Sequence, residues 1–147
     1  MIVVADTSAL LAAFDNSQTE HHAARSVMLN DHLLISPLVL AELDHLARRD
    51  LGFPAVVSIM DALAARMDAG QYRLATLHLA DLQAAQRVRT AYASLKLDLA
   101  DAINVVLAHR HQTNLLLTLD HRDFRAVKPL SARFTGFHLL PADNAST

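Results

Sequence analysis

The chain has 147 residues, of which 52% are apolar and 19% are charged, and it contains no Cys, no Trp and only three Gly. We expect one domain with its own core from a chain of this length and composition. The absence of Cys excludes a disulfide scaffold, a Cys-ligated zinc site and a thiol nucleophile, and the three scattered glycines leave no glycine-rich phosphate loop. The formal net charge of −2 gives no overall positive field of the kind that indicates a nucleic-acid partner.

Short apolar segments alternate with segments of helical character along the chain. In chain order we expect a strand over residues 2–5, helices over 9–14 and 21–29, a strand over 33–35, helices over 37–50 and 55–67, a strand over 72–75, helices over 80–95 and 98–111, and strands over 115–119 and 137–140. This alternation predicts an α/β/α sandwich with a central, mostly parallel sheet of four to five strands.

The predicted domain covers residues 1–140, and residues 141–147 are expected to form a loose polar tail. No apolar run reaches the roughly 18 residues of a membrane span, and the first residues lack the basic segment of a secretory leader. We therefore expect a cytoplasmic protein with no membrane partner.

Several acidic side chains are predicted to meet at one edge of the sheet. Asp6 follows the first strand and Asp120 follows the strand over residues 115–119, so parallel strands would bring both acids to the carboxyl edge. Asp98 and Asp101 lie one turn apart where the helix leading into that strand begins. Glu42 lies mid-helix on the border of a leucine arc, where a carboxylate is costly unless it is paired or bound to a cation.

Each of these acids has a purely structural explanation when it is taken alone. Asp6 and Asp98 could cap helices, Asp120 could occupy a turn, and Glu42 could pair with Arg49 two turns along. The whole group is harder to explain in this way, because converging carboxylates repel one another unless a cation holds them. A site of carboxylate oxygens selects Mg²⁺ or Mn²⁺ over zinc and suits hydrolysis of a phosphodiester by a metal-activated water.

Four ordered segments contain these acids: residues 4–11, 36–43, 99–108 and 117–124. They resemble the four motifs of PIN-domain ribonucleases, specifically the VapC toxins of VapBC toxin–antitoxin pairs, and together they span nearly the whole chain. The resemblance implies a PIN-like fold in which a metal-binding and catalytic quartet is formed by Asp6, Glu42, Asp101 and Asp120, with Asp98 as a further metal ligand. It also implies supporting or substrate-contacting roles for Thr7, Ser8, Asn104, His121, Arg122 and Asp123.

The same resemblance implies a function and partners. We expect a toxin that is an Mg²⁺-dependent endoribonuclease, with Mn²⁺ as the alternative ion, and that is inhibited by a cognate VapB antitoxin. Such toxins commonly form homodimers and assemble with the antitoxin, and the apolar helices over 55–67 and 80–95 could supply either face. Basic residues late in the chain predict a rim that contacts phosphate around the acids: Arg110, Arg122, Arg125, Lys128 and Arg133.

Two other functions fit parts of the pattern. A phospho-receiver domain also has an acidic pocket at the edge of a parallel sheet, but it needs an acidic pair after the first strand and a late Lys, where this chain has Asp6 alone and Asp120. A DNA-directed nuclease of the same superfamily is typically larger than 147 residues. The nine His match no zinc signature, and we expect most of them to be solvated.

Overall fold

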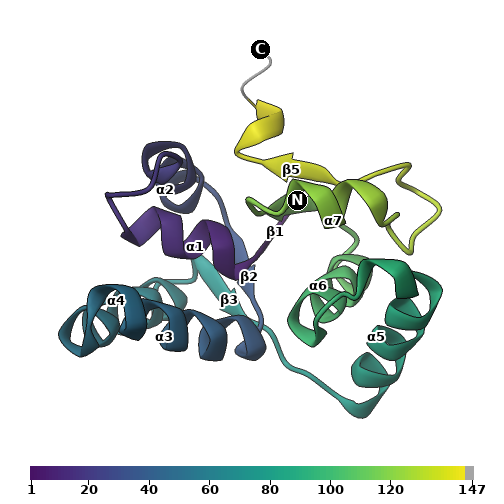
Figure 1. The fold of residues 1–147 in the computed structure, drawn as a ribbon, viewed down its shortest axis with the longest axis horizontal. Helices are drawn as coiled ribbons and strands as arrows, with labels where there is room; N and C mark the ends of the chain where they lie inside the picture. The colour runs from purple at the N-terminus through teal and green to yellow at the C-terminus, as the bar shows by residue number, and fades with distance from the viewer. Residues whose placement is uncertain (145–147) are drawn as a thin grey trace.

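The strands form a single parallel sheet in the computed structural model, which describes residues 1–144. The strands β1 (Val3–Ala5), β2 (Leu33–Ile35), β3 (Tyr72–Leu74), β4 (Leu115–Leu117) and β5 (His138–Leu140) lie in the order β3-β2-β1-β4-β5 (Figure 1). Every neighbouring pair is parallel. The predicted α/β class and parallel sheet are confirmed, so the carboxyl ends of the strands meet at one edge.

Helices make most of the connections between strands. They are α1 (Thr7–Phe14), α2 (His21–Asn30), α3 (Pro37–Leu51), α4 (Phe53–Asp68), α5 (Leu79–Ala91), α6 (Leu99–Arg110) and α7 (His121–Ala126), with short 3₁₀ turns η1 (Ala93–Leu95) and η2 (Ala142–Asn144). Helices α1 to α4 lie on one side of the sheet, and α5 and α6 lie on the other (Figure 1). No helix in residues 1–144 is both long and apolar enough to cross a membrane.

The sheet separates two hydrophobic cores. Val3 and Ala5 point into the core that α1 to α4 cover, whereas Val4 points into the core that α5 and α6 cover. Leu34 and Leu116 join Val4 in the second core. Because successive residues of a strand face opposite sides, an uninterrupted apolar run is what a sheet covered on both faces requires.

The largest departure from the predicted elements lies between α5 and α6. The helix predicted over residues 80–95 ends at Ala91, and the turn η1 and Lys96, in the left-handed conformation, follow it. Two contacts hold this turn: Arg89 Nε donates to Leu97 O at 3.0 Å across the turn, and Lys128 N, from a distant part of the chain, donates to Tyr92 Oη at 3.1 Å. Such contacts cannot be seen in local helix propensity, which favours continuation.

Two further differences lie near the carboxyl edge. The strand predicted over residues 115–119 ends at Leu117. Thr118 N still donates to Leu140 O at 3.0 Å, but the Thr118 hydroxyl donates to Asp6 and Leu119 N donates to the Ser8 hydroxyl on α1. The structure also adds α7, which was not predicted. Of the predicted tail, residues 142–144 form η2, and residues 145–147 lie outside the described part.

Phe124 anchors α7 in the core, and its removal tests the fold. It is 1% exposed and packs edge-on against Phe137, with ring centroids 6.3 Å apart. We expect Phe124→Ala to lower the free energy of unfolding by about 3–4 kcal/mol, as deletion of a buried aromatic ring does. Urea unfolding measures the change, with Phe53→Ala as the control because Phe53 is 59% exposed. Equal losses for the two variants would contradict the packing of α7.

Candidate metal centre

Asp6 is the most buried acid at the carboxyl edge. It follows β1, is 6% exposed, and its backbone N donates to Leu117 O at 2.8 Å. Its Oδ2 accepts hydrogen bonds from Ser8 Oγ and Thr118 Oγ1, both at 2.8 Å. Burial raises the pKa of Asp6, and the bonds from the two hydroxyls act in the opposite direction because they stabilise the ionised carboxylate.

The end of β4 fixes the direction of both hydroxyl protons. Asp120 N donates to Thr118 Oγ1 at 3.0 Å, and Leu119 N donates to Ser8 Oγ at 3.0 Å. A hydroxyl that accepts from a backbone N–H still has its own proton to donate, and here that proton points to Asp6. The chain that carries Asp120 therefore also orients Asp6.

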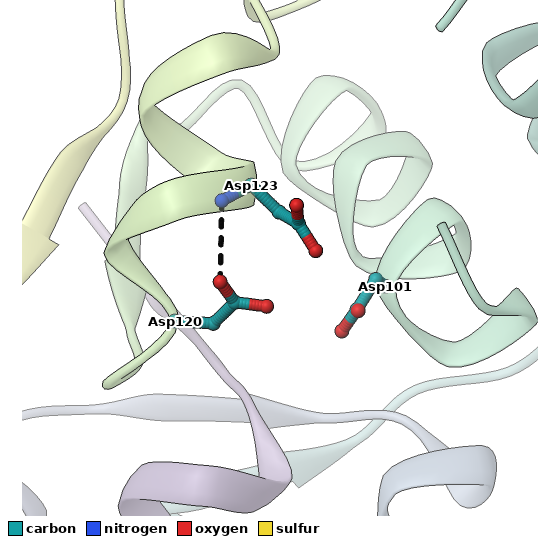
Figure 2. Close-up of side chains that lie close together, drawn as sticks. All are labelled: Asp101, Asp120 and Asp123. Carbon is teal, nitrogen blue, oxygen red and sulfur yellow. Dashed lines mark hydrogen bonds between the residues drawn. The ribbon is translucent and has the colours of Figure 1, made fainter. Parts of the chain in front are cut away.

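Three carboxylates converge where α6 meets α7 (Figure 2). Asp101, Asp120 and Asp123 each offer one oxygen, and these oxygens all lie within 4.8 Å of one another. Asp120 caps α7 by accepting from Asp123 N at 3.2 Å, and Asp98 caps α6 by accepting from Asp101 N at 2.9 Å. The cap formed by Asp98 thus helps to fix the position of Asp101, and the cap formed by Asp120 helps to fix that of Asp123.

Asp101 is at the electrostatic centre of the whole group. Its pKa is raised to about 9, first by burial and then by the charges of Asp6, Asp98, Asp120 and Glu42. Of the five acids that the sequence assigned to the metal site, Asp101 and Asp120 thus offer oxygens within 4.8 Å of each other, and Asp6, Asp98 and Glu42 are near enough for their charges to raise the pKa of Asp101. Asp123 joins them, and its pKa is raised first by burial and then by Asp120.

Glu42 faces this group from α3. Burial raises its pKa, the charges of Asp98 and Asp6 raise it further, and the hydroxyl of Thr7 partly offsets the rise, although that hydroxyl makes no hydrogen bond of normal geometry. Arg49 does not cover Glu42. It pairs instead with its neighbour Asp50, Nε to Oδ1 at 2.7 Å.

Some of the residues expected to support the site or to contact substrate touch the acids, and others do not. Ser8 contacts Asp6 as expected, whereas Asn104 donates from Nδ2 to Ala5 O at 3.4 Å and makes no hydrogen bond to Asp101. The Oδ1 atom of Asn104 is buried without a partner. His121 and Arg122 are exposed on the first turn of α7, and the charge of Arg122 lowers the pKa of Asp123.

Thr118 is the contact that sequence reasoning missed. Its signal was present, because Thr118 is the single polar residue between the apolar Leu115–Leu117 run and Leu119. A buried hydroxyl in such a strand needs a partner, and the acid after the neighbouring strand is the partner within reach. Thr118 is completely buried.

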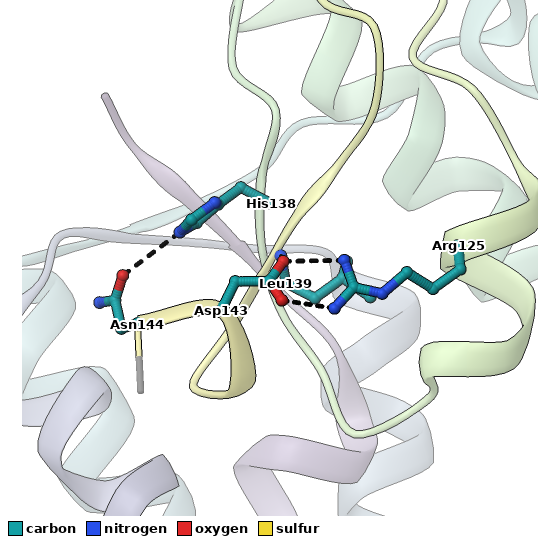
Figure 3. Close-up of polar contacts among 5 residues, drawn as sticks. All are labelled: Arg125, His138, Leu139, Asp143 and Asn144. Atoms are coloured by element: carbon teal, nitrogen blue, oxygen red, sulfur yellow. Dashed lines mark hydrogen bonds and ion pairs between the residues drawn. The ribbon is translucent and has the colours of Figure 1, made fainter. Parts of the chain in front are cut away.

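The predicted basic rim is only partly present. Arg125 pairs with both carboxylate oxygens of Asp143, NH1 to Oδ2 at 2.8 Å, and Leu139 N donates to the same Oδ2 at 2.7 Å (Figure 3). Arg110 donates from NH1 to Asp81 Oδ2 at 2.6 Å. These two arginines are thus already paired with carboxylates of the chain itself, which leaves less of their charge available to phosphate than the prediction assumed. Arg122, Lys128 and Arg133 remain exposed.

Comparison with known proteins identifies this architecture. The family profile described as PIN domain matches residues 3–129. The chain belongs to the PIN-domain family. Ribonuclease VapC26 of Mycobacterium tuberculosis is 40% identical over 136 residues, which cover 90% of this chain and 98% of the relative. This membership sets aside the phospho-receiver alternative.

Solved structures of toxin–antitoxin proteins share the fold of this PIN domain. M. tuberculosis VapC20, described as a sarcin-ricin loop cleaving toxin, has a TM-score of 0.71 at 18% identity and covers 82% of this chain and 91% of its own. VapBC2 of Rickettsia felis, bound to a DNA fragment from its promoter, has a TM-score of 0.67 at 15% identity, with 95% and 98% coverage. A toxin–antitoxin complex from Klebsiella pneumoniae has a TM-score of 0.60 at 19% identity, with 90% and 98% coverage.

Thr118→Val tests the hydroxyl contacts of Asp6. Valine fills the same space but cannot donate to Asp6 or accept from Asp120 N, so we expect the affinity for Mn²⁺ to fall about 10-fold or more. Isothermal titration measures this affinity. Thr118→Ser, which restores the hydroxyl, should recover most of the affinity, and a valine variant that binds Mn²⁺ as tightly as the wild type would contradict the role.

Asp101→Asn tests the crowding of the carboxylates. With a pKa near 9 in the folded chain against a usual value of 3.8, Asp101 keeps a proton that the unfolded chain releases, so the metal-free protein loses stability as pH rises through this interval. Asparagine is neutral throughout. We expect the variant to melt several degrees higher than the wild type at pH 8 in EDTA, where about 1 kcal/mol corresponds to roughly 3 °C.

Thermal melts between pH 5 and pH 9 check this expectation. The gain in Tm from Asp101→Asn must grow with pH, whereas the exposed Asp44→Asn should show no such trend. A gain that stays constant or shrinks as pH rises would mean that Asp101 is ionised without cost.

Proposed function

We propose that the acidic centre binds Mg²⁺, with Mn²⁺ as an alternative, and that the protein uses it to cleave RNA. Family membership and the 40% identity to a VapC ribonuclease make the chain a toxin–antitoxin endoribonuclease. The convergence of carboxylates on Asp101 supports the location of the active site. Burial and the charges of Asp6, Asp98, Asp120 and Glu42 raise the pKa of Asp101, and one of its carboxylate oxygens lies within 4.8 Å of oxygens of Asp120 and Asp123.

The donor set fits a hard divalent cation. All the groups that converge are carboxylates, and the chain has no Cys to favour a softer metal. Burial and then the charges of neighbouring acids raise the pKa values of Asp101 and Glu42, and a bound cation offsets both effects because it stabilises the ionised carboxylates. The side chain of buried Asn104 contacts Ala5, the last residue of β1, and its Oδ1, which has no hydrogen-bond partner within residues 1–144, is a further oxygen near Asp6.

We assign the metal to Asp6, Glu42, Asp101 and Asp120, with Asp98 and Asp123 as further ligands directly or through water. When bound, a divalent cation lowers the pKa of water and stabilises charge on phosphate oxygens. The hydrogen bonds from Ser8 and Thr118 lower the pKa of Asp6 against the effect of burial, and so favour its ionised form. Asp101 holds a proton in the metal-free protein, so it must release that proton when a cation binds.

Substrate contacts come from the exposed start of α7. His121 and Arg122 lie beside Asp120 and face solvent, and we assign them to the phosphate next to the cleaved bond. The positive charge of Arg122 offsets part of the rise in the pKa of Asp123 that burial and Asp120 cause, so this charge lies at the rim of the acidic group. A cytoplasmic location follows from the proposed RNA substrate.

The antitoxin partner is of the VapB type, as in the VapBC complexes that share the fold. Exposed apolar side chains remain on the two helices that were predicted to supply partner faces. Phe53 and Val57 on α4 are 59% and 43% exposed, and Leu79 and Leu82 on α5 are 69% and 43% exposed. These surfaces offer apolar area for a homodimer and for the antitoxin.

A cleavage assay tests the proposal. Purified, antitoxin-free protein is incubated with total RNA and with a DNA strand of matched sequence, with Mg²⁺ or with EDTA. We expect Mg²⁺-dependent cleavage of RNA only, and a loss of at least about 100-fold in Asp6→Ala and Asp101→Ala, since each removes a proposed metal ligand.

A matched pair on α3 controls for changes of charge. Glu42→Gln should lose activity to a similar extent, whereas Asp44→Asn should retain it, because Asp44 is exposed and lies outside the acidic group. Cleavage that persists in EDTA, or equal activity of the Glu42 and Asp44 variants, would contradict the metal-dependent mechanism.

A further inference from the structure

A shallow groove is formed by the second half of α5 and the turn that leads to the start of α6. It has a volume of about 580 Å³ and is lined by Gln86, Arg89, Thr90, Ala93, Lys96 and Leu97. A neighbouring hollow shares Gln86 and Thr90 and adds Arg87. Leu97 immediately precedes Asp98, so the groove leads to the acidic end of α6.

The groove has positive charge without acidic neighbours in its own segment. Residues 82–97 contain no Asp or Glu but include Arg87, Arg89 and Lys96. None of the three takes part in the ion pairs formed within residues 1–144. They differ in this respect from Arg110 and Arg125, whose carboxylate partners neutralise them.

Arg89 is held in place before any ligand arrives. Its Nε donates to Leu97 O and its NH1 donates to Gln86 Oε1, both at 3.0 Å. The other terminal nitrogen has no hydrogen bond within the described chain. A guanidinium whose plane is already fixed loses little conformational freedom when it binds a phosphate.

Lys96 occupies a strained backbone position. Its φ of 52° places it in the left-handed region, where glycine fits without strain and a residue with a Cβ does not. Helix termini commonly use glycine at such a position. The turn thus places the positive charge of Lys96 in the lining of the groove, at a position where glycine would relieve the strain.

We infer that the groove at residues 86–97 binds the phosphate backbone of the RNA strand as it approaches the acidic centre. This inference rests on the proposed ribonuclease function and adds a binding site to it. The lining is polar and basic and includes no aromatic ring for base stacking, so the contacts are to phosphate and independent of sequence. A groove for a protein segment would offer more apolar surface than Ala93 and the buried Leu97.

The variant Lys96→Gly removes the positive charge of Lys96 without destabilising the fold. Glycine relieves the backbone strain, so the variant should fold at least as stably as the wild type while it loses the charge. The probe is a fluorescein-labelled single-stranded RNA oligonucleotide titrated in EDTA, which prevents metal-dependent cleavage, with affinity measured by anisotropy. At 0.1 M salt we expect Lys96→Gly to bind about 5-fold more weakly, and Lys96→Gly with Arg87→Gln more weakly still.

The salt dependence gives a second measurement. Each lost phosphate contact should reduce the slope of log K against log[salt] by about 0.7 for single-stranded nucleic acid. Arg25→Gln is the matched control, because it removes one exposed charge on α2, on the other side of the sheet. It should leave both the affinity and the slope close to those of the wild type.

The outcomes distinguish this inference from the proposed function. If the groove variants keep the wild-type affinity for RNA and the wild-type salt slope, the inference that the groove binds RNA is overturned, even if RNA cleavage in Mg²⁺ is intact. Weaker binding of antitoxin with unchanged binding of RNA would also overturn it, in favour of a protein partner. A wild-type protein that binds RNA through the groove but never cleaves it would overturn the proposed function alone.

Discussion

Repulsion among crowded carboxylates is the constraint on which the rest of this structure depends. Asp101 lies among the charges of Asp6, Asp98, Asp120 and Glu42, and burial together with these charges raises its pKa to about 9, so full ionisation of the group is unfavourable without a cation. The fold compensates with oriented donors. Hydroxyls bond to Asp6, and the first turns of α6 and α7 present their backbone N–H groups to Asp98 and Asp120. The rigid scaffold therefore stores unfavourable energy that binding of a cation can release.

The acidic centre also joins the two hydrophobic layers. Glu42 comes from α3 on one side of the sheet, and Asp101 comes from α6 on the other side, with Asp6 at the end of β1 between them (Figure 1). Neither layer contains the complete group of acids. Assembly of the centre therefore requires both cores to form, which couples metal affinity to the stability of the whole domain rather than to that of one motif.

The sequence predicted the parts of the site that follow directly from chain topology. Acids after the ends of parallel strands must meet at one edge, and for this reason Asp6 and Asp120 could be placed before the structure was known. Pairings between distant residues could not be predicted in this way. Arg110 and Asp81 are 29 residues apart, and Arg125 and Asp143 are 18 apart, so nothing local indicated that these arginines were neutralised. Thr118 had a local signal, but its partner at Asp6 depends on β1 lying beside β4.

The contact between Arg125 and Asp143 has a practical consequence. It ties η2, at the end of the described chain, to α7, the helix that begins at Asp120 and carries Asp123 (Figure 3). Met1 instead precedes β1 and so lies at the opposite, amino edge of the sheet. An affinity tag or fluorescent fusion added after residue 147 thus continues the segment of chain whose Asp143 holds α7 through Arg125. Fusions at the N-terminus keep the foreign segment away from it, and are the better choice for handling this protein.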